Sequence, residues 1–410
     1  MIFRNRPLVR LGAAALLASG AFTALGAPAQ AAGTATDLSL DVVGTRVADN
    51  AAYKVAFAKV TNKGENTPSE LTVRAEFAKV DWSKVGVIPA VNGDDCTAEG
   101  DGDQPTAITC SVPQADLPGA GETLDVPIFL IKLVDSLDEA YSAPVSITIA
   151  SKDDTNAGNN TRSTTVEFTK QSGADLTVLA DDVKNAVTVK SGKIELAGDL
   201  HAGDTARLIY TVWNQGDLPT AGLKVKVKLP KGVTFAEPLE SECGYTADLA
   251  ELLCTYDNLP FVPQEQDTKD GDNVTAGGRF YHILTVGKDV KAGALSGGTV
   301  EVEPILPKEG VAPQSTKIKT MPANMTPVQG DDLDASDNTD GYAVVVAAQG
   351  GAGGGDSNGN GGGGLPVTGA NAGLLGGVGV AVLAAGGAMF LVARRRRVVL
   401  VTPGDEKPTA

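Results

Sequence analysis

Residues 223–229 read LKVKVKL, and this alternation of apolar and basic side chains decides the fold class. A period of two places the apolar side chains on one face of an extended strand and the lysines on the other. Residues 71–77, LTVRAEF, alternate in the same way in the first half of the chain. Turn-forming segments such as PKG at residues 230–232 follow at short intervals, and between the two ends of the chain no stretch keeps a 3.6-residue period. The pattern therefore predicts an all-β fold.

An internal repeat appears when marker segments are compared between the two halves. The opening markers are DLSL at residues 37–40 and DLTV at residues 175–178. The next markers are AFAKVTNKG, which ends at Gly64, and LIYTVWNQG, which ends at Gly216. The closing markers are AGNNT at residues 157–161 and ASDNT at residues 335–339. Their common order indicates two copies of one design.

Each copy has the length of a single domain. Several short strands, each with one apolar face, bury that face best as two sheets packed face to face. The sequence therefore predicts two tandem immunoglobulin-like β-sandwich domains, one over residues 32–170 and the other over residues 174–347, with a short linker between them.

The amino-terminal end has the pattern of a secretory signal peptide. Arg4, Arg6 and Arg10 precede an uncharged run over residues 11–25, and AQA at residues 29–31 has the small-x-small form of a cleavage site. The apolar run is shorter than the roughly 20 residues that a membrane-spanning helix needs. We therefore expect residues 1–31 to be a signal peptide, and the protein to be exported.

The carboxy-terminal end contains three elements in a fixed order. LPVTG at residues 365–369 is followed by an uncharged segment over residues 370–393 and a basic tail over residues 394–410. As a helix, the uncharged segment would be about 36 Å long, enough to cross a bilayer. Four arginines then act as a stop-transfer signal on the cytoplasmic side: Arg394, Arg395, Arg396 and Arg397. The alternative is a single-pass membrane protein in which LPVTG occurs by chance.

Residues 365–410 resemble the LPxTG cell-wall sorting signal of Gram-positive surface proteins. The resemblance implies that a sortase cysteine attacks the Thr368 carbonyl and releases Gly369, and that a peptidoglycan amine resolves the acyl-enzyme. It assigns sortase recognition to five residues: Leu365, Pro366, Val367, Thr368 and Gly369. Pro366 restricts Leu365 to extended geometry, which suits a peptide that binds in a groove.

A second resemblance covers most of the second half. Residues 203–235, GDTARLIYTVWNQGDLPTAGLKVKVKLPKGVTF, are similar to the conserved-repeat domains called DUF11 or CARDB-like, which occur in tandem on bacterial surface proteins. The first half matches more loosely because it lacks the Pro-x-Gly-Val segment. This resemblance implies an immunoglobulin-like fold and a spacer or adhesive role, and it transfers no catalytic or binding residues.

The four cysteines are divided evenly between the two repeats. In an exported protein, an even number at short separations favours disulfides. Four cysteines allow three pairings, and the repeat selects Cys96–Cys110 and Cys243–Cys254. A zinc site would need closer spacing and usually histidine, so we expect two disulfides.

Composition excludes some functions and leaves others open. A net charge of −16 excludes nucleic acid as a partner, and two histidines, His201 and His282, are too few for a His-rich metal site. Several loops are acidic, for example residues 94–103 and 331–337, but none has calcium-loop spacing. Solvated turns are favoured there, with weak calcium binding as the alternative. No metal and no cofactor are expected.

Together with these patterns, the two resemblances imply a non-enzymatic surface protein of a Gram-positive cell wall. Residues 348–364, AQGGAGGGDSNGNGGGG, form a flexible linker between the sandwiches and the sorting signal. The expected partners are sortase, peptidoglycan and an unknown extracellular ligand, and the membrane-bound form is a transient intermediate. The alternatives are a subunit of a sortase-assembled fibre, which would need a YPKN-type lysine motif that is absent, or a wall-attached hydrolase, for which the two repeats leave no catalytic domain.

Overall fold

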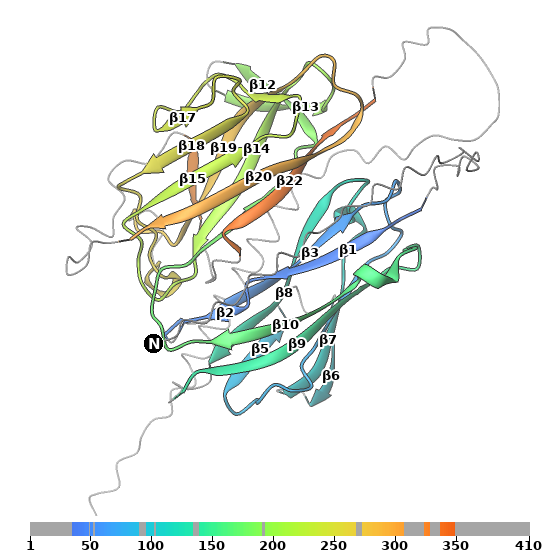
Figure 1. Ribbon diagram of the computed structural model, residues 1–410, viewed down its shortest axis with the longest axis vertical. Helices are drawn as coiled ribbons and strands as arrows, with labels where there is room; N and C mark the ends of the chain where they lie inside the picture. Colours follow the sequence, from blue (N-terminus) through green and yellow to red (C-terminus); the bar gives the residue numbers. More distant parts are fainter. Residues whose placement is uncertain are drawn as a thin grey trace, which may run out of the picture. The chain divides into compact units, whose positions relative to one another are not determined.

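The regular secondary structure of the described part of the chain is almost entirely β-strand (Figure 1). The computed structural model describes residues 35–48, 50–51, 54–89, 96–101, 104–133, 139–190, 193–267, 273–306, 324–328 and 337–348. Its only helical elements there are three 3-10 turns: η2 (Gln114–Asp116), η3 (Ala157–Asn159) and η4 (Gln264–Gln266). The all-β prediction is confirmed. Over these same residues, no helix combines the length and the apolar character needed to span a bilayer.

The first repeat forms a sandwich of two sheets. One sheet has the strand order β1-β3-β8-β5, and the other has the order β2-β10-β9-β4-β7-β6. The strands are β1 (Leu38–Val43), β2 (Arg46–Val47), β3 (Lys54–Asn62), β4 (Thr72–Glu76), β5 (Val85–Pro89), β6 (Cys96–Asp101), β7 (Gln104–Ser111), β8 (Thr123–Leu133), β9 (Tyr141–Ala150) and β10 (Thr161–Phe168).

The second repeat forms a sandwich of the same plan. One sheet has the order β13-β12-β14-β19-β16, with β11 added on β14 and β21 on β19, and the other has the order β17-β18-β15-β20-β22. The first six strands are β11 (Leu176–Ala180), β12 (Asn185–Lys190), β13 (Lys193–Asp199), β14 (Thr205–Asn214), β15 (Gly222–Lys228) and β16 (Val233–Phe235). The remaining strands are β17 (Cys243–Tyr245), β18 (Glu251–Tyr256), β19 (Gly277–Val286), β20 (Gly293–Ile305), β21 (Met325–Val328) and β22 (Thr339–Val346).

The alternation that predicted the fold appears directly in the burial of β15. Leu223, Val225 and Val227 are fully buried, whereas Lys224 and Lys226 on the same strand are exposed. In the first sandwich, the apolar members of LTVRAEF are buried in the same way. Because burying these faces removes apolar surface from water, the period-two pattern drives the formation of both sandwiches.

Each sandwich has its own main hydrophobic core. The larger cluster in the first sandwich draws on residues 38–168, and the larger cluster in the second draws on residues 176–346. In the described part of the chain, no sheet combines strands from both repeats. The prediction of two tandem immunoglobulin-like sandwiches is therefore confirmed. The predicted signal peptide, sorting signal and membrane-spanning segment lie outside the described residues, as does the linker beyond residue 348.

Candidate functional site

The predicted site residues fall into two groups. The sorting pentapeptide, Leu365 to Gly369, and the stop-transfer arginines, Arg394 to Arg397, lie outside the described residues. All four cysteines lie inside them. The candidate site in the folded part must therefore be built from the sandwiches themselves.

The cysteines form two cross-strand disulfides with the pairing that the sequence favoured. Cys96 of β6 lies directly opposite Cys110 of β7 and is bonded to it, with a Cα–Cα distance of 4.0 Å. Cys243 of β17 and Cys254 of β18 repeat this arrangement at 3.9 Å. Since β6 and β17 are the edge strands of their sheets, each disulfide ties an edge to its neighbour.

The outer face of the first sandwich carries a row of polar side chains across five strands. Alternate residues of each strand point outward. The registers place one such residue of each strand directly opposite one of the next strand, so that together they form a row across the sheet. From β10 to β6, the row consists of Thr161, Thr148, Arg74, Thr109 and Thr97. The next row contains Ser163, Ser146, Glu76 and Glu99. This face offers many hydroxyl donors and acceptors.

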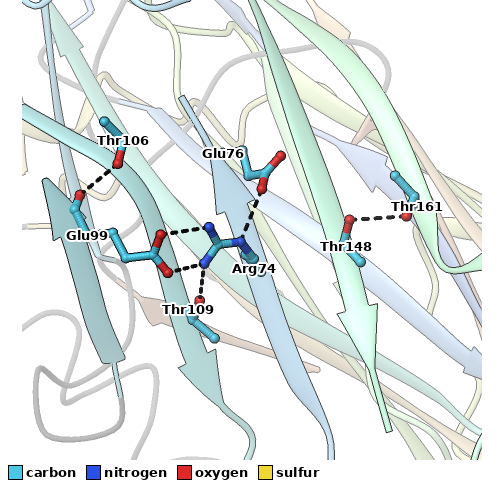
Figure 2. Close-up of polar contacts among 7 residues, drawn as sticks. All are labelled: Arg74, Glu76, Glu99, Thr106, Thr109, Thr148 and Thr161. Carbon is cyan, nitrogen blue, oxygen red and sulfur yellow. Dashed lines mark hydrogen bonds and ion pairs between the residues drawn. The ribbon is translucent and has the colours of Figure 1, made fainter. Parts of the chain in front are cut away.

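Arg74 lies at the centre of this face and joins three strands (Figure 2). Its Nη1 and Nη2 atoms both donate to the Glu99 carboxylate, with an Nη2–Oε2 distance of 2.9 Å. Its Nε atom donates to Glu76 at 3.2 Å, and Nη1 also donates to the Thr109 hydroxyl at 3.1 Å. The bond to Arg74 lowers the pKa of the Glu99 carboxyl, and the bonds to Glu99 and Glu76 raise the pKa of the guanidinium. Arg74 is thus held in a bidentate pair with Glu99.

Two further contacts order the hydroxyls around Arg74. The Thr148 and Thr161 hydroxyls lie 3.1 Å apart, and the Thr106 hydroxyl donates to the Glu99 carbonyl at 3.2 Å (Figure 2). The described part of this face holds ordered hydrogen-bonding groups. Its chemistry suits reversible binding of a polar ligand.

The corresponding face of the second sandwich carries two cross-strand ion pairs between β15 and β20. Lys224 pairs with Glu303 at 3.3 Å, and Lys226 pairs with Glu301 at 3.8 Å. These side chains are about half exposed, so the pairs contribute little to stability. The two outer faces therefore present different chemistry on the same strand plan.

A buried polar pair lies inside the second sandwich. The Tyr210 hydroxyl is 3.0 Å from Nε2 of His282, and both residues belong to the core. Burial lowers the pKa of His282 to about 4, so the imidazole is neutral at neutral pH. Phe235 packs edge-on against the same ring. His282 therefore acts as a core residue of the second sandwich.

No group of three or more His, Cys, Asp and Glu side chains in the described part of the chain could hold a metal ion. Most acidic residues of the loops at residues 94–103 and 331–337 lie outside that part, including Asp94, Asp95, Asp103, Asp331 and Asp332. The weak-calcium alternative for those loops stays a prediction.

Comparisons with known proteins add little to this description. No family model matches the chain, and no curated protein matches it. Among solved structures, the B domain of a biofilm-associated protein aligns with 76% of this chain and 86% of its own, at 9% identity and a TM-score of 0.23. The collagen adhesin of S. aureus aligns with 77% of this chain and 94% of its own, at 9% identity and a TM-score of 0.20.

A transglutaminase of red sea bream also aligns, over 77% of this chain and 32% of its own, at 10% identity and a TM-score of 0.21. Scores this low carry no argument about the present chain. The fold assignment rests on the strands, registers and cores described above.

Proposed function

We propose that this chain is an exported surface protein that a sortase attaches covalently to peptidoglycan through Thr368. The two sandwiches act as a non-enzymatic stalk or adhesive module outside the wall. The observation that carries the proposal is the order of three elements in the sequence: LPVTG, then an uncharged segment long enough to cross a bilayer, then four arginines.

The folded part is consistent with this role. Two disulfides suit an oxidising compartment outside the cytoplasm. The Gly-rich residues 348–364 would separate the sorting pentapeptide from the second sandwich, which leaves it accessible to a membrane-bound enzyme. The hydroxyl-rich face around Arg74 is the described surface best suited to a polar extracellular ligand.

Cell fractionation in a sortase-bearing Gram-positive host tests the attachment. The wild-type protein should be released by a wall-degrading enzyme and resist detergent, because its link to peptidoglycan is covalent. Thr368→Ala should shift it to the detergent-soluble membrane fraction, whereas Thr402→Ala, in the predicted cytoplasmic tail, should leave it in the wall. Complete extraction of the wild type by detergent would contradict the proposal.

A binding screen of the secreted chain distinguishes a stalk from an adhesin. Host glycans, matrix proteins and the cell's own wall polymers are the probes. Binding that Arg74→Ala weakens would place the ligand on the outer face of the first sandwich. Absence of binding to every probe would favour the stalk.

A further inference from the structure

The larger sheet of the second sandwich has an outer face unlike the one that carries the Lys–Glu pairs. Strand alternation and the β14–β19 register identify its outward residues, which are partly exposed except for the buried Ile283. Lys, Asp and Glu, the usual residues of a solvated face, do not occur among them. These residues, called the β14–β19 face below, are Thr205, Arg207, Ile209, Thr211 and Trp213 of β14, and Arg279, Tyr281, Ile283 and Thr285 of β19.

Two aromatic side chains lie on this face on either side of Arg279. Trp213 is opposite Gly277 in the register, and a Cβ on that glycine would lie 2.6 Å from Cδ1 of the indole. The glycine therefore leaves room for the ring to lean across from β14 toward β19. Tyr281 lies further along the same face, opposite Ile209. Aromatic rings beside a few polar groups are typical of ligand-binding surfaces.

The two arginines carry more positive charge than the neighbouring acid neutralises. Nη2 of Arg279 donates to Oδ2 of Asp181 at 3.1 Å. Arg207 is half-buried, and no hydrogen bond or ion pair to its guanidinium occurs within the described part of the chain. Burial and the charge of Arg279 both lower the pKa of the Arg207 guanidinium. Arg207 is thus a cation in an unfavourable place, and an anionic ligand would relieve that cost.

The binding groups of the β14–β19 face are spread along the strands. From Arg207 to Trp213 a strand advances about 20 Å, at roughly 3.3 Å per residue. A single small anion would contact one end of this stretch, whereas a linear polymer would reach both arginines and both aromatic rings. Guanidinium groups bind carboxylates through two parallel hydrogen bonds. Aromatic rings offer flat apolar surfaces to the C–H faces of sugar rings.

We propose that the β14–β19 face binds a linear saccharide that carries carboxylates, of the uronic-acid class. Arg207 binds a carboxylate, and Trp213 and Tyr281 support the sugar rings. Because the whole chain has a net charge of −16, an anionic polymer is repelled from most of its surface, and salt should weaken its attraction to the arginines. This face is separate from the hydroxyl-rich face around Arg74. Its binding does not depend on attachment at Thr368, which determines only the saccharides that it meets.

Tryptophan fluorescence of the full secreted chain tests the proposal, because the sequence contains two tryptophans. Trp82 packs against Phe77 in the first sandwich, so Trp82→Phe leaves Trp213 as the reporter. Hyaluronan oligosaccharides, which contain glucuronate, represent host glycans, and a glucuronate polysaccharide purified from Gram-positive walls represents the wall. At least one of them should change the Trp213 emission saturably, and the tighter one identifies the source.

Two further probes show whether both features of the ligand are recognised. Neutral chito-oligosaccharides of the same length lack the carboxylate and should bind at least tenfold more weakly. Hexaglutamate has carboxylates without sugar rings and should also bind at least tenfold more weakly. Equal binding of either probe would overturn the proposal, and so would an unchanged Trp213 emission with both uronate polymers.

Substitutions of Arg207 separate a binding role from a structural one. Arg207→Met should weaken uronate binding at least tenfold, and Arg207→Lys, which keeps the charge but not the planar fork, should weaken it less. Arg162→Met, at an exposed arginine of the first sandwich, is the matched control and should change binding less than twofold. Without ligand, Arg207→Met should raise the melting temperature of the second sandwich, because it removes a half-buried cation that has no partner. A lower melting temperature with unchanged binding would assign Arg207 a structural role and contradict the proposal.

Discussion

The two sandwiches share a buried asparagine that organises each of them in the same way. The Asn62 side-chain oxygen accepts from the Gly64 N–H at 2.9 Å, and the Asn214 oxygen accepts from the Gly216 N–H at 2.8 Å. Each side-chain amide also donates to two backbone carbonyls. The acceptors are Asn66 and Pro118 in the first sandwich, and Leu218 and Phe261 in the second. These bonds satisfy loop carbonyls that strands do not pair.

The glycines two residues later are required by close approach of the backbone. A Cβ on Gly64 would lie 2.3 Å from the Ala35 carbonyl oxygen, and one on Gly216 would lie 2.4 Å from that of Gly173. In both repeats the segment that leads into the first strand passes over this glycine. The N-x-G marker of the sequence repeat is thus a structural device for closing the sandwich.

The two repeats differ outside this shared structural frame, which consists of the asparagine hydrogen bonds and the glycine contacts. The second sandwich adds the β12–β13 hairpin, carries a histidine in its core and presents two Lys–Glu pairs where the first presents a row of threonines around Arg74. The comparison teaches that a few polar anchors and cross-strand disulfides define the architecture, whereas the outer faces are available for different surface chemistry. Four measurements test this division, from the largest expected effect to the smallest.

Val225→Asp should produce the largest effect, because it places a carboxylate in the core of the second sandwich. Val225 is fully buried between Cys254 and Val302 on the neighbouring strands. We expect a loss of about 4 kcal/mol or more from the unfolding free energy of the second sandwich, and almost none from the first. Denaturant unfolding followed by circular dichroism should show one transition shifted and one unchanged.

Two matched variants show which unfolding transition belongs to which sandwich, and test the alternation of buried and exposed side chains along the strand. Val73→Asp, at the equivalent place on β4, should shift the other transition. Lys226→Asp, which faces solvent, should cost less than about 1 kcal/mol. If Val225→Asp abolished both transitions, the two repeats would share one cooperative unit and the comparison of two sandwiches would fail.

Asn62→Ala and Asn214→Ala should each cost about 2–4 kcal/mol, because each leaves buried backbone groups without partners. The two losses should be similar and should appear in different transitions. Lys63→Ala, beside Asn62 but exposed, serves as the control and should have little effect. If either variant had the unfolding free energy of the wild type, that asparagine would not belong to the shared structural frame.

Acid should destabilise the second sandwich but not the first through protonation of His282. Its pKa is about 4 in the folded protein and about 6.5 when unfolded, so the unfolded chain binds the extra proton between these values. Stability from this group is complete above pH 6.5 and is lost as the pH falls toward 4, by up to about 3 kcal/mol. The first repeat contains no histidine and lacks this loss.

Unfolding free energies measured from pH 7 to pH 4.5 check this difference. His282→Phe should remove the acid loss that the imidazole causes, even though it leaves the Tyr210 hydroxyl without its partner. Asp340 and Asp182 should then give a slope of the opposite sign, because burial raises their pKa values to about 7 and about 6. An unchanged slope in the variant would show that carboxyl groups, and not the imidazole, cause the acid sensitivity.

The sequence was sufficient for features that repeat or alternate locally. The alternating pattern of LKVKVKL predicted β15 and its buried face. The presence of one cysteine pair in each repeat predicted the observed disulfides. The β12–β13 hairpin and the two-residue strand β2 were not foreseen. Both depend on which distant strands lie beside them, and neither is long or regular enough to carry a pattern of its own.

The Arg74–Glu99 pair could have been found with one further step. A disulfide between directly opposite residues of adjacent antiparallel strands fixes their register, and Cys96 opposite Cys110 sets Glu99 opposite Ala107. Arg74 and Glu76 were already assigned to the outer face of the neighbouring strand. What the sequence alone lacked was the register between β4 and β7, which tertiary pairing supplies.

Arg74→Ala should produce the smallest effect, despite the number of bonds that this side chain makes. Arg74 is about one-third exposed and Glu99 is more than half exposed, so water and salt screen their attraction and replace the lost hydrogen bonds. The disulfide already ties β6 to β7, which leaves little for the ion pair to hold. We expect the melting temperature of the first sandwich to fall by no more than about 2 °C, and by less at high salt. Lys224→Ala, which removes an ion pair on the outer face of the second sandwich, should behave alike. If Arg74→Ala instead lowered the melting temperature strongly while Lys224→Ala did not, the outer face of the first sandwich would belong to its structural frame, and its hydroxyl row could no longer be treated as a surface free to serve a ligand.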